Sequence, residues 1–132
     1  MKHFYVFVIL ILFTSCASNK IKTIEGKWEQ EFLGYKTEKT SVPVTHNAAL
    51  IDIKKDENTL KIEFDFNDGY EKDKTDSVGF KYPQLKFRKI NLDKSSNYYS
   101  LIYQPNCDCF LGEMKSFSGN ILNIKLNRVS AR

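Results

Sequence analysis

Apolar and polar residues alternate one by one along most of this chain from Ile24 onward. The clearest run is Leu60–Phe66, in which every even position is apolar and every odd position is charged. Successive side chains of an extended strand point to opposite faces, so a period of two predicts strands with one buried and one solvated face. No segment shows the 3.6-residue stripe of an amphipathic helix. The pattern therefore predicts an all-β chain.

Turn-forming residues divide the alternating runs into strands, for example at Asn67-Asp68-Gly69 and Ser118-Gly119-Asn120. The predicted strands lie at about residues 25–33, 48–55, 59–67, 76–82, 84–92, 97–104, 108–117 and 120–128. Short loops between sequential strands make them antiparallel neighbours. We therefore expect an eight-stranded antiparallel up-and-down barrel, with a β-sandwich as the alternative.

One predicted strand changes phase within itself. Leu85 and Phe87 alternate with polar residues, but the next apolar residue, Ile90, is out of step with them. An extra residue inserted into one strand produces such a slip, so the sequence predicts a β-bulge at Arg88-Lys89.

The first fifteen residues have the composition of an export signal. Lys2 supplies a basic start, and the ten residues Phe4–Phe13 are apolar. This run is shorter than the about 20 residues that span a bilayer. The small residues Thr14-Ser15 then precede Cys16. Residues 1–15 are therefore predicted to be a signal peptide.

Thr14-Ser15-Cys16 resembles the lipobox of bacterial lipoproteins, although Phe13 stands where leucine is usual. In that family the signal is removed before the cysteine, which then carries a diacylglycerol and an amide-linked acyl chain such as palmitate. Two or more acyl chains anchor a protein stably. The resemblance implies lipidation at Cys16, a tether over residues 16–23 and a barrel domain over residues 24–132. Ala17, where an acidic residue would imply inner-membrane retention, implies the outer membrane, facing the periplasm. The alternative is an ordinary signal peptide that leaves Cys16 as a spare thiol.

Both ends of the predicted barrel carry residues of a known motif. Gly26-Lys27-Trp28 opens the first strand and resembles the Gly-x-Trp motif of lipocalin-like barrels. In lipocalins the tryptophan closes one end of the barrel, and a basic residue after the last strand covers its ring. Arg128 stands in that place. A guanidinium over an indole gains about 0.5–2 kcal/mol. The resemblance implies a lipocalin-like small bacterial lipoprotein closed by Gly26, Trp28 and Arg128. The Thr-Asp-Tyr motif and C-terminal helix of many lipocalins are missing, so it implies architecture more than a ligand.

Cys107-Asp108-Cys109 is the one unusual constellation in the chain. Side chains two positions apart on a strand share a face. Outside the cytoplasm, thiols oxidise, which favours a disulfide within the pair. Two independent thiols are a second interpretation. A soft-metal site for Cu(I), with Met114 or His46 as a further ligand, is a third.

Charge and composition narrow the function. Lys+Arg number 20 and Asp+Glu 16, a formal charge of +4, which gives no case for nucleic acid. One histidine, His46, remains after the signal, and no Gly-x-Ser-x-Gly elbow exists, so we expect neither enzyme activity nor a cofactor. An eight-stranded barrel can hold one small ligand. The main prediction is a site for a small hydrophobic or amphipathic ligand in an internal cavity of at least about 300 Å³. The alternatives are a barrel that binds an envelope protein, as an inhibitor or assembly accessory, and a metal or redox sensor that uses Cys107 and Cys109.

Overall fold

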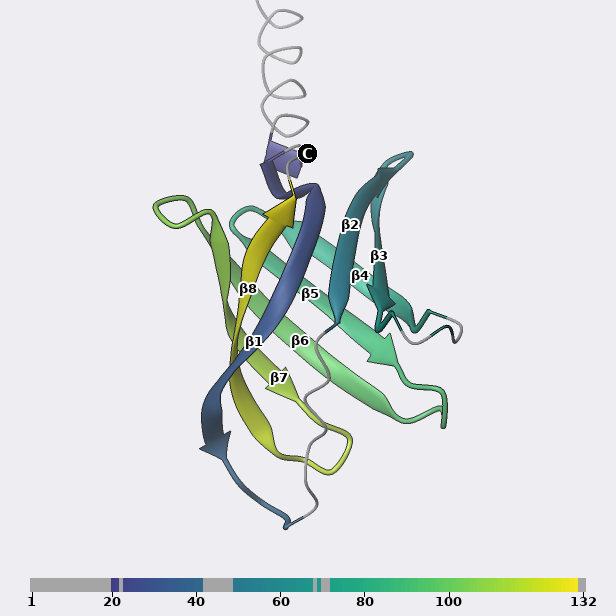
Figure 1. Ribbon diagram of the computed structural model, residues 1–132, viewed down its shortest axis with the longest axis vertical. Coiled ribbons are helices and arrows are strands. Elements are labelled where there is room, and N and C mark those ends of the chain that lie inside the picture. The colour runs from purple at the N-terminus through teal and green to yellow at the C-terminus, as the bar shows by residue number, and fades with distance from the viewer. Residues whose placement is uncertain (1–19, 22, 42–48, 68, 70–71, 131–132) are drawn as a thin grey trace, which may run out of the picture.

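The computed structural model describes residues 20–21, 23–41, 49–67, 69 and 72–130. Residues 1–15, Cys16 and His46, which the sequence analysis singled out, lie outside this part of the chain. The strands are β1 (Gly26–Thr37), β2 (Leu50–Asp56), β3 (Thr59–Asp65), β4 (Lys74–Lys81), β5 (Gln84–Ile90), β6 (Ser96–Gln104), β7 (Cys109–Lys115) and β8 (Ile121–Ser130). The all-β prediction is therefore confirmed (Figure 1).

The eight strands form one antiparallel sheet in the order β3-β2-β1-β8-β7-β6-β5-β4. Sequential strands other than β3 and β4 pair with one another, and β1 pairs with β8, so the first and last strands lie side by side (Figure 1). The β1–β8 register shifts at three places, which bends β1 around the barrel. This is the predicted up-and-down barrel, and the sandwich alternative is wrong because a single sheet curls on itself.

The barrel is nearly closed, and its seam lies between β3 and β4. Among the described residues, one isolated bridge joins these strands, at Phe64 and Asp73. The amide of Asp73 donates to the carbonyl oxygen of Phe64 over 3.2 Å. Further along, the hydroxyl of Thr75 donates to the carbonyl oxygen of Ile62 over 2.7 Å. These two hydrogen bonds hold the strands together at the end of the seam where the β3–β4 connection lies.

Buried aromatic rings fill the barrel in two groups. At one end, the Trp28 ring lies 4.9 Å from Phe110 and 6.5 Å from Tyr103, between ring centroids. Further along the axis, Phe87 and Tyr99 stack at 4.6 Å, and Phe64 lies 5.5 Å from Tyr99. Offset and edge-on ring pairs are the favoured arrangements. The interior that the sequence analysis expected to be hollow is therefore occupied by side chains at both levels.

The predicted β-bulge at Arg88-Lys89 is wrong. β5 pairs with β6 residue by residue from Gln84 to Ile90, with no shift. Lys89 takes the next inward position after Leu85 and Phe87, and its ammonium lies 3.0 Å from the carboxylate of Asp73. The break in hydrophobic pattern thus marks a buried ion pair. The register shift lies on the neighbouring strand β4, between Asp76 and Gly79.

Candidate functional site

A groove of about 590 Å³ runs along the β3–β4 seam. Its apolar lining consists of Leu60 and Ile62 from β3 and Val78 from β4, all three of which pack against the barrel core. Because β3 and β4 lack a continuous ladder, the groove comes close to the core here: Val78 is partly exposed, whereas Leu60 and Ile62 lie beneath it and are buried. Three lysines and three carboxylates surround the groove: Lys61, Lys72, Lys74, Asp56, Glu63 and Asp73. The groove therefore combines an apolar floor with a charged rim.

The rim charges on β3 are held in place by ion pairs. The carboxylate of Glu63 lies 2.8 Å from the ammonium of Lys61 and 3.7 Å from that of Lys72. The hydrogen bond from Lys61 lowers the pKa of Glu63 below its ordinary value, and the charges of Lys61, Lys72 and Lys54 lower it further. The same hydrogen bond raises the pKa of Lys61. Glu63 and Lys61 therefore both stay charged over the neutral pH range.

A buried polar cluster lies beside the groove, within the barrel. The side chains of Lys89 and Asp73 are only 10% and 7% exposed, and Asp73 also lines the groove. The ammonium of Lys89 lies 5.2 Å from the Phe64 ring centroid and 4.8 Å from that of Phe66. Burial, and then the charge of Asp73, raise the pKa of Tyr99, whose hydroxyl donates to Gln30 over 3.1 Å. Tyr99 therefore stays neutral, and the cluster has no net charge.

The opposite end of the barrel, here called the closed end, is plugged by Trp28. The guanidinium carbon of Arg128 lies 4.1 Å from the indole centroid, so the structure brings these two predicted residues together. Arg128 also donates to the carbonyl oxygens of Glu25 and Thr23, over 2.7 and 2.6 Å. Gly26 adopts a φ of +135°, which only glycine reaches without strain. These contacts fix the chain as it leads into β1.

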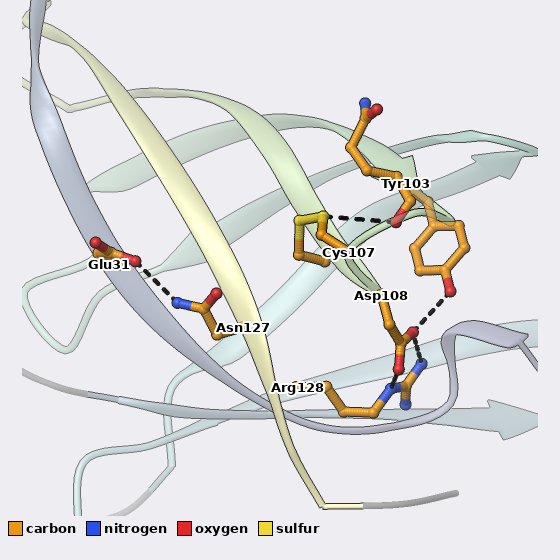
Figure 2. Close-up of a disulfide and its surroundings, with 8 residues drawn as sticks. Glu31, Tyr103, Cys107, Asp108, Asn127 and Arg128 are labelled. Carbon is orange, nitrogen blue, oxygen red and sulfur yellow. Dashed lines mark hydrogen bonds and ion pairs between the residues drawn. A yellow bond between two sulfur atoms is a disulfide. The ribbon is translucent and has the colours of Figure 1, made fainter.

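Cys107 and Cys109 form a disulfide in the β6–β7 turn (Figure 2). Their two sulfurs are bonded to each other, and Met114 is buried in the core further along β7. In the part of the chain that the structure describes, no group of three or more metal-ligating side chains gathers. The disulfide interpretation thus matches the geometry of this turn, and the Cu(I) interpretation finds no further ligand there.

Sequence reasoning missed the residue between the two cysteines. The carboxylate of Asp108 accepts hydrogen bonds from Arg128, over 2.6 and 3.0 Å, and from the hydroxyl of Tyr103, over 2.7 Å (Figure 2). Burial and the carboxylate of Asp108 raise the pKa of Tyr103. The signal that could have found Asp108 is its position: an acid flanked by two cysteines, on the turn that meets the predicted closure arginine.

Two further depressions lie on the outer surface of the barrel. One, of about 360 Å³, is lined mainly by residues of β5–β7, which include the half-exposed Tyr98 and the core residues Phe87 and Tyr99. The other, of about 480 Å³, lies between Leu33, Ile102 and Leu111 on β1, β6 and β7. Neither lies between two neighbouring strands that lack a continuous ladder, as the seam groove does. The seam groove is therefore the candidate site.

Within the described residues, no helix has the length and apolar character that crossing a membrane requires. Comparisons of the chain with family models, with curated proteins and with solved structures find no match.

Proposed function

We propose that this protein is a lipid-anchored envelope lipoprotein whose lipocalin-like barrel binds a small amphipathic ligand in the β3–β4 groove. The groove itself carries the proposal. Its volume of about 590 Å³ falls within the range of about 300–1,000 Å³ that is usual for small-molecule sites. An apolar floor with a few polar groups at the margin is also typical of such sites.

The charges around the groove indicate the kind of head group. Three lysines face three carboxylates, but one of these carboxylates, Asp73, is already paired with the buried Lys89. The rest of the rim therefore has three ammonium groups against two carboxylates, an excess of one positive charge. We therefore infer a single-chain amphiphile whose head group contains a negatively charged group such as a phosphate, and whose apolar part contacts Leu60, Ile62 and Val78.

A dansyl-labelled single-chain phosphocholine tests this proposal. It is titrated into the full-length chain carrying Cys16→Ser, and into the same chain with Val78→Asp. A carboxylate placed on the apolar lining should weaken binding at least about tenfold, since burying a charge beside an apolar chain costs more than about 1.4 kcal/mol. Leu33→Asp is the control, because Leu33 is 50% exposed on the outer face of β1. No binding, or equal losses in both variants, would contradict the proposal.

The way in which the chain leads into the barrel supports the anchoring part of the proposal. Residues 23–25 are held at the closed end by Arg128, and the Lys20 ammonium lies 5.2 Å from the Tyr82 ring centroid. A lipid on Cys16 would therefore attach close to the closed end. Cell fractionation tests this: Cys16→Ser should move the folded protein from the outer membrane to the soluble periplasmic fraction. Retention of the variant in the membrane would contradict lipid anchoring at this residue.

A further inference from the structure

The two sulfurs of the Cys107–Cys109 disulfide differ in their access to solvent. Cys107 is exposed in the β6–β7 turn, whereas Cys109 is only 2% exposed at the start of β7. A thiolate must reach one sulfur of a disulfide directly, so access decides which sulfur is attacked. In this disulfide the attacked atom is the Sγ of Cys107, and the Sγ of Cys109 is the leaving group.

The disulfide also encloses the residue that holds the closed end together. Asp108 adopts a φ of +47°, a conformation that non-glycine residues rarely take. In this conformation its carboxylate contacts Arg128 through two hydrogen bonds, of 2.6 and 3.0 Å. Arg128 in turn covers Trp28. The disulfide joins the two neighbours of Asp108 at a Cα–Cα distance of 5.2 Å, and so restricts the backbone between them.

We propose that Cys107–Cys109 is a thiol–disulfide exchange site for dithiols, and that Asp108 transmits its redox state to the closed end of the barrel. None of Cys107, Asp108 and Arg128 lines the β3–β4 groove, so this proposal stands apart from the ligand proposed above.

The exchange proceeds in two balanced steps. One thiolate of the dithiol attacks the Sγ of Cys107, the bond to Cys109 breaks, and Cys109 leaves as a thiolate that takes a proton from water. The second thiol of the dithiol loses its proton and attacks the mixed disulfide, which releases Cys107 as a thiolate that is protonated in turn. The dithiol is oxidised to a disulfide by two electrons, and the protein disulfide is reduced to two thiols.

Reduction removes the restraint on Asp108. The backbone can then leave the left-handed conformation, which carries the carboxylate away from Arg128. Because Arg128 covers the one tryptophan of the chain, its displacement changes the surroundings of the Trp28 indole. The emission of Trp28 therefore reports the redox state of the turn.

The first test follows reduction of the full-length chain carrying Cys16→Ser by dithiothreitol, a small dithiol. We expect a rate that rises in proportion to dithiothreitol, and a shift in Trp28 emission that keeps pace with the appearance of two thiols per chain. The Cys107→Ser/Cys109→Ser double variant is the control. It should have the Trp28 emission of the reduced protein, and dithiothreitol should not change that emission. A rate independent of dithiothreitol would show that unfolding must precede attack, and would overturn the exchange site. Thiols that appear without an emission shift would overturn the transmission through Asp108.

The second test identifies the attacked sulfur. In the same background, Cys109→Ser leaves the thiol of Cys107, and Cys107→Ser leaves that of Cys109. Both variants lack the disulfide, so they are matched for its loss, and far-UV circular dichroism checks that both are folded. With glutathione disulfide as the probe, we expect Cys107 to form the mixed disulfide at least tenfold faster than Cys109, measured by mass spectrometry. Equal or reversed rates would show that Cys107 is not the reactive sulfur.

Discussion

At the scale of single residues, Arg128 on β8 connects the start of β1, the segment before it and the β6–β7 turn. Its guanidinium contacts Trp28, Asp108 and the carbonyl oxygens of Thr23 and Glu25, and its side chain is only 11% exposed. Arg128→Ala removes these contacts, uncovers the Trp28 ring and takes a charged donor from three partly buried acceptor groups, so we expect the unfolding free energy to fall by about 2–4 kcal/mol. Urea denaturation followed by Trp28 emission measures the change.

Arg128→Lys is the matched variant for that experiment. It keeps the positive charge but lacks the planar fork that donates in several directions at once. The lysine variant should therefore recover less than half of the loss. Full recovery would mean that charge alone, and not the hydrogen bonds to the two carbonyl oxygens, stabilises the closed end.

The contacts around Arg128 and Lys89 show which interactions the sequence alone can predict. Trp28 and Arg128 could be paired because the first and last strands of a barrel must meet, and the two residues sit opposite each other in the β1–β8 register. Asp108 could not be found in this way, because its contact with Arg128 depends on a left-handed backbone conformation in a turn. Lys89 led to a wrong prediction because its partner, Asp73, lies just before the neighbouring strand β4, outside the strand predicted there.

At the scale of elements, the alternation of apolar and polar residues predicted all eight strands. It did not predict the ends of strands in charged segments. β4 begins at Lys74 rather than at residue 76, because Lys74, Thr75 and Asp76 show no apolar alternation. β1 continues to Thr37 because register shifts let it follow β8 past Gly34. Hydrogen bonding between neighbouring strands determines where β1 and β4 end. The hydrophobic pattern of a single strand does not predict that pairing.

The β6–β7 pair depends on a glycine whose role the sequence does not show. Gly112 lies opposite Leu101, and a Cβ built on it would stand 2.1 Å from the carbonyl oxygen of Ser100. Gly112→Ala must push the two backbones apart, so we expect a loss of roughly 1–3 kcal/mol in thermal or urea unfolding. Gly79→Ala on β4 is the control, since its Cβ would meet nothing within 4 Å. That variant should stay within about 0.5 kcal/mol of the parent. Similar losses in both variants would instead point to a general effect of glycine replacement.

At the scale of the whole molecule, the number of strands and their short loops predicted a barrel. They did not predict which two neighbouring strands form the seam. Which neighbouring pair is left open depends on the register of all eight strands together. The expected volume was placed inside the barrel, but the large aromatic side chains occupy that interior, and the groove lies at the seam instead. The sequence could therefore predict a barrel, but not where its apolar interior meets solvent.

The seam makes a sharp prediction for amide hydrogen exchange along β3. The carbonyl oxygen of Ile62 faces β4, and the N–H of the same strand residue points the same way. The amides of Leu60 and Ile62 therefore face the seam, whereas those of Lys61 and Glu63 face the paired strand β2. We expect the two seam amides to exchange at least roughly a hundredfold faster than the two β2-facing amides, because amides outside a continuous ladder exchange through small local openings. Residue-resolved exchange by NMR measures this. Equal protection of all four amides would mean that β3 and β4 are joined as tightly as the other neighbours, and that the groove is closed in solution.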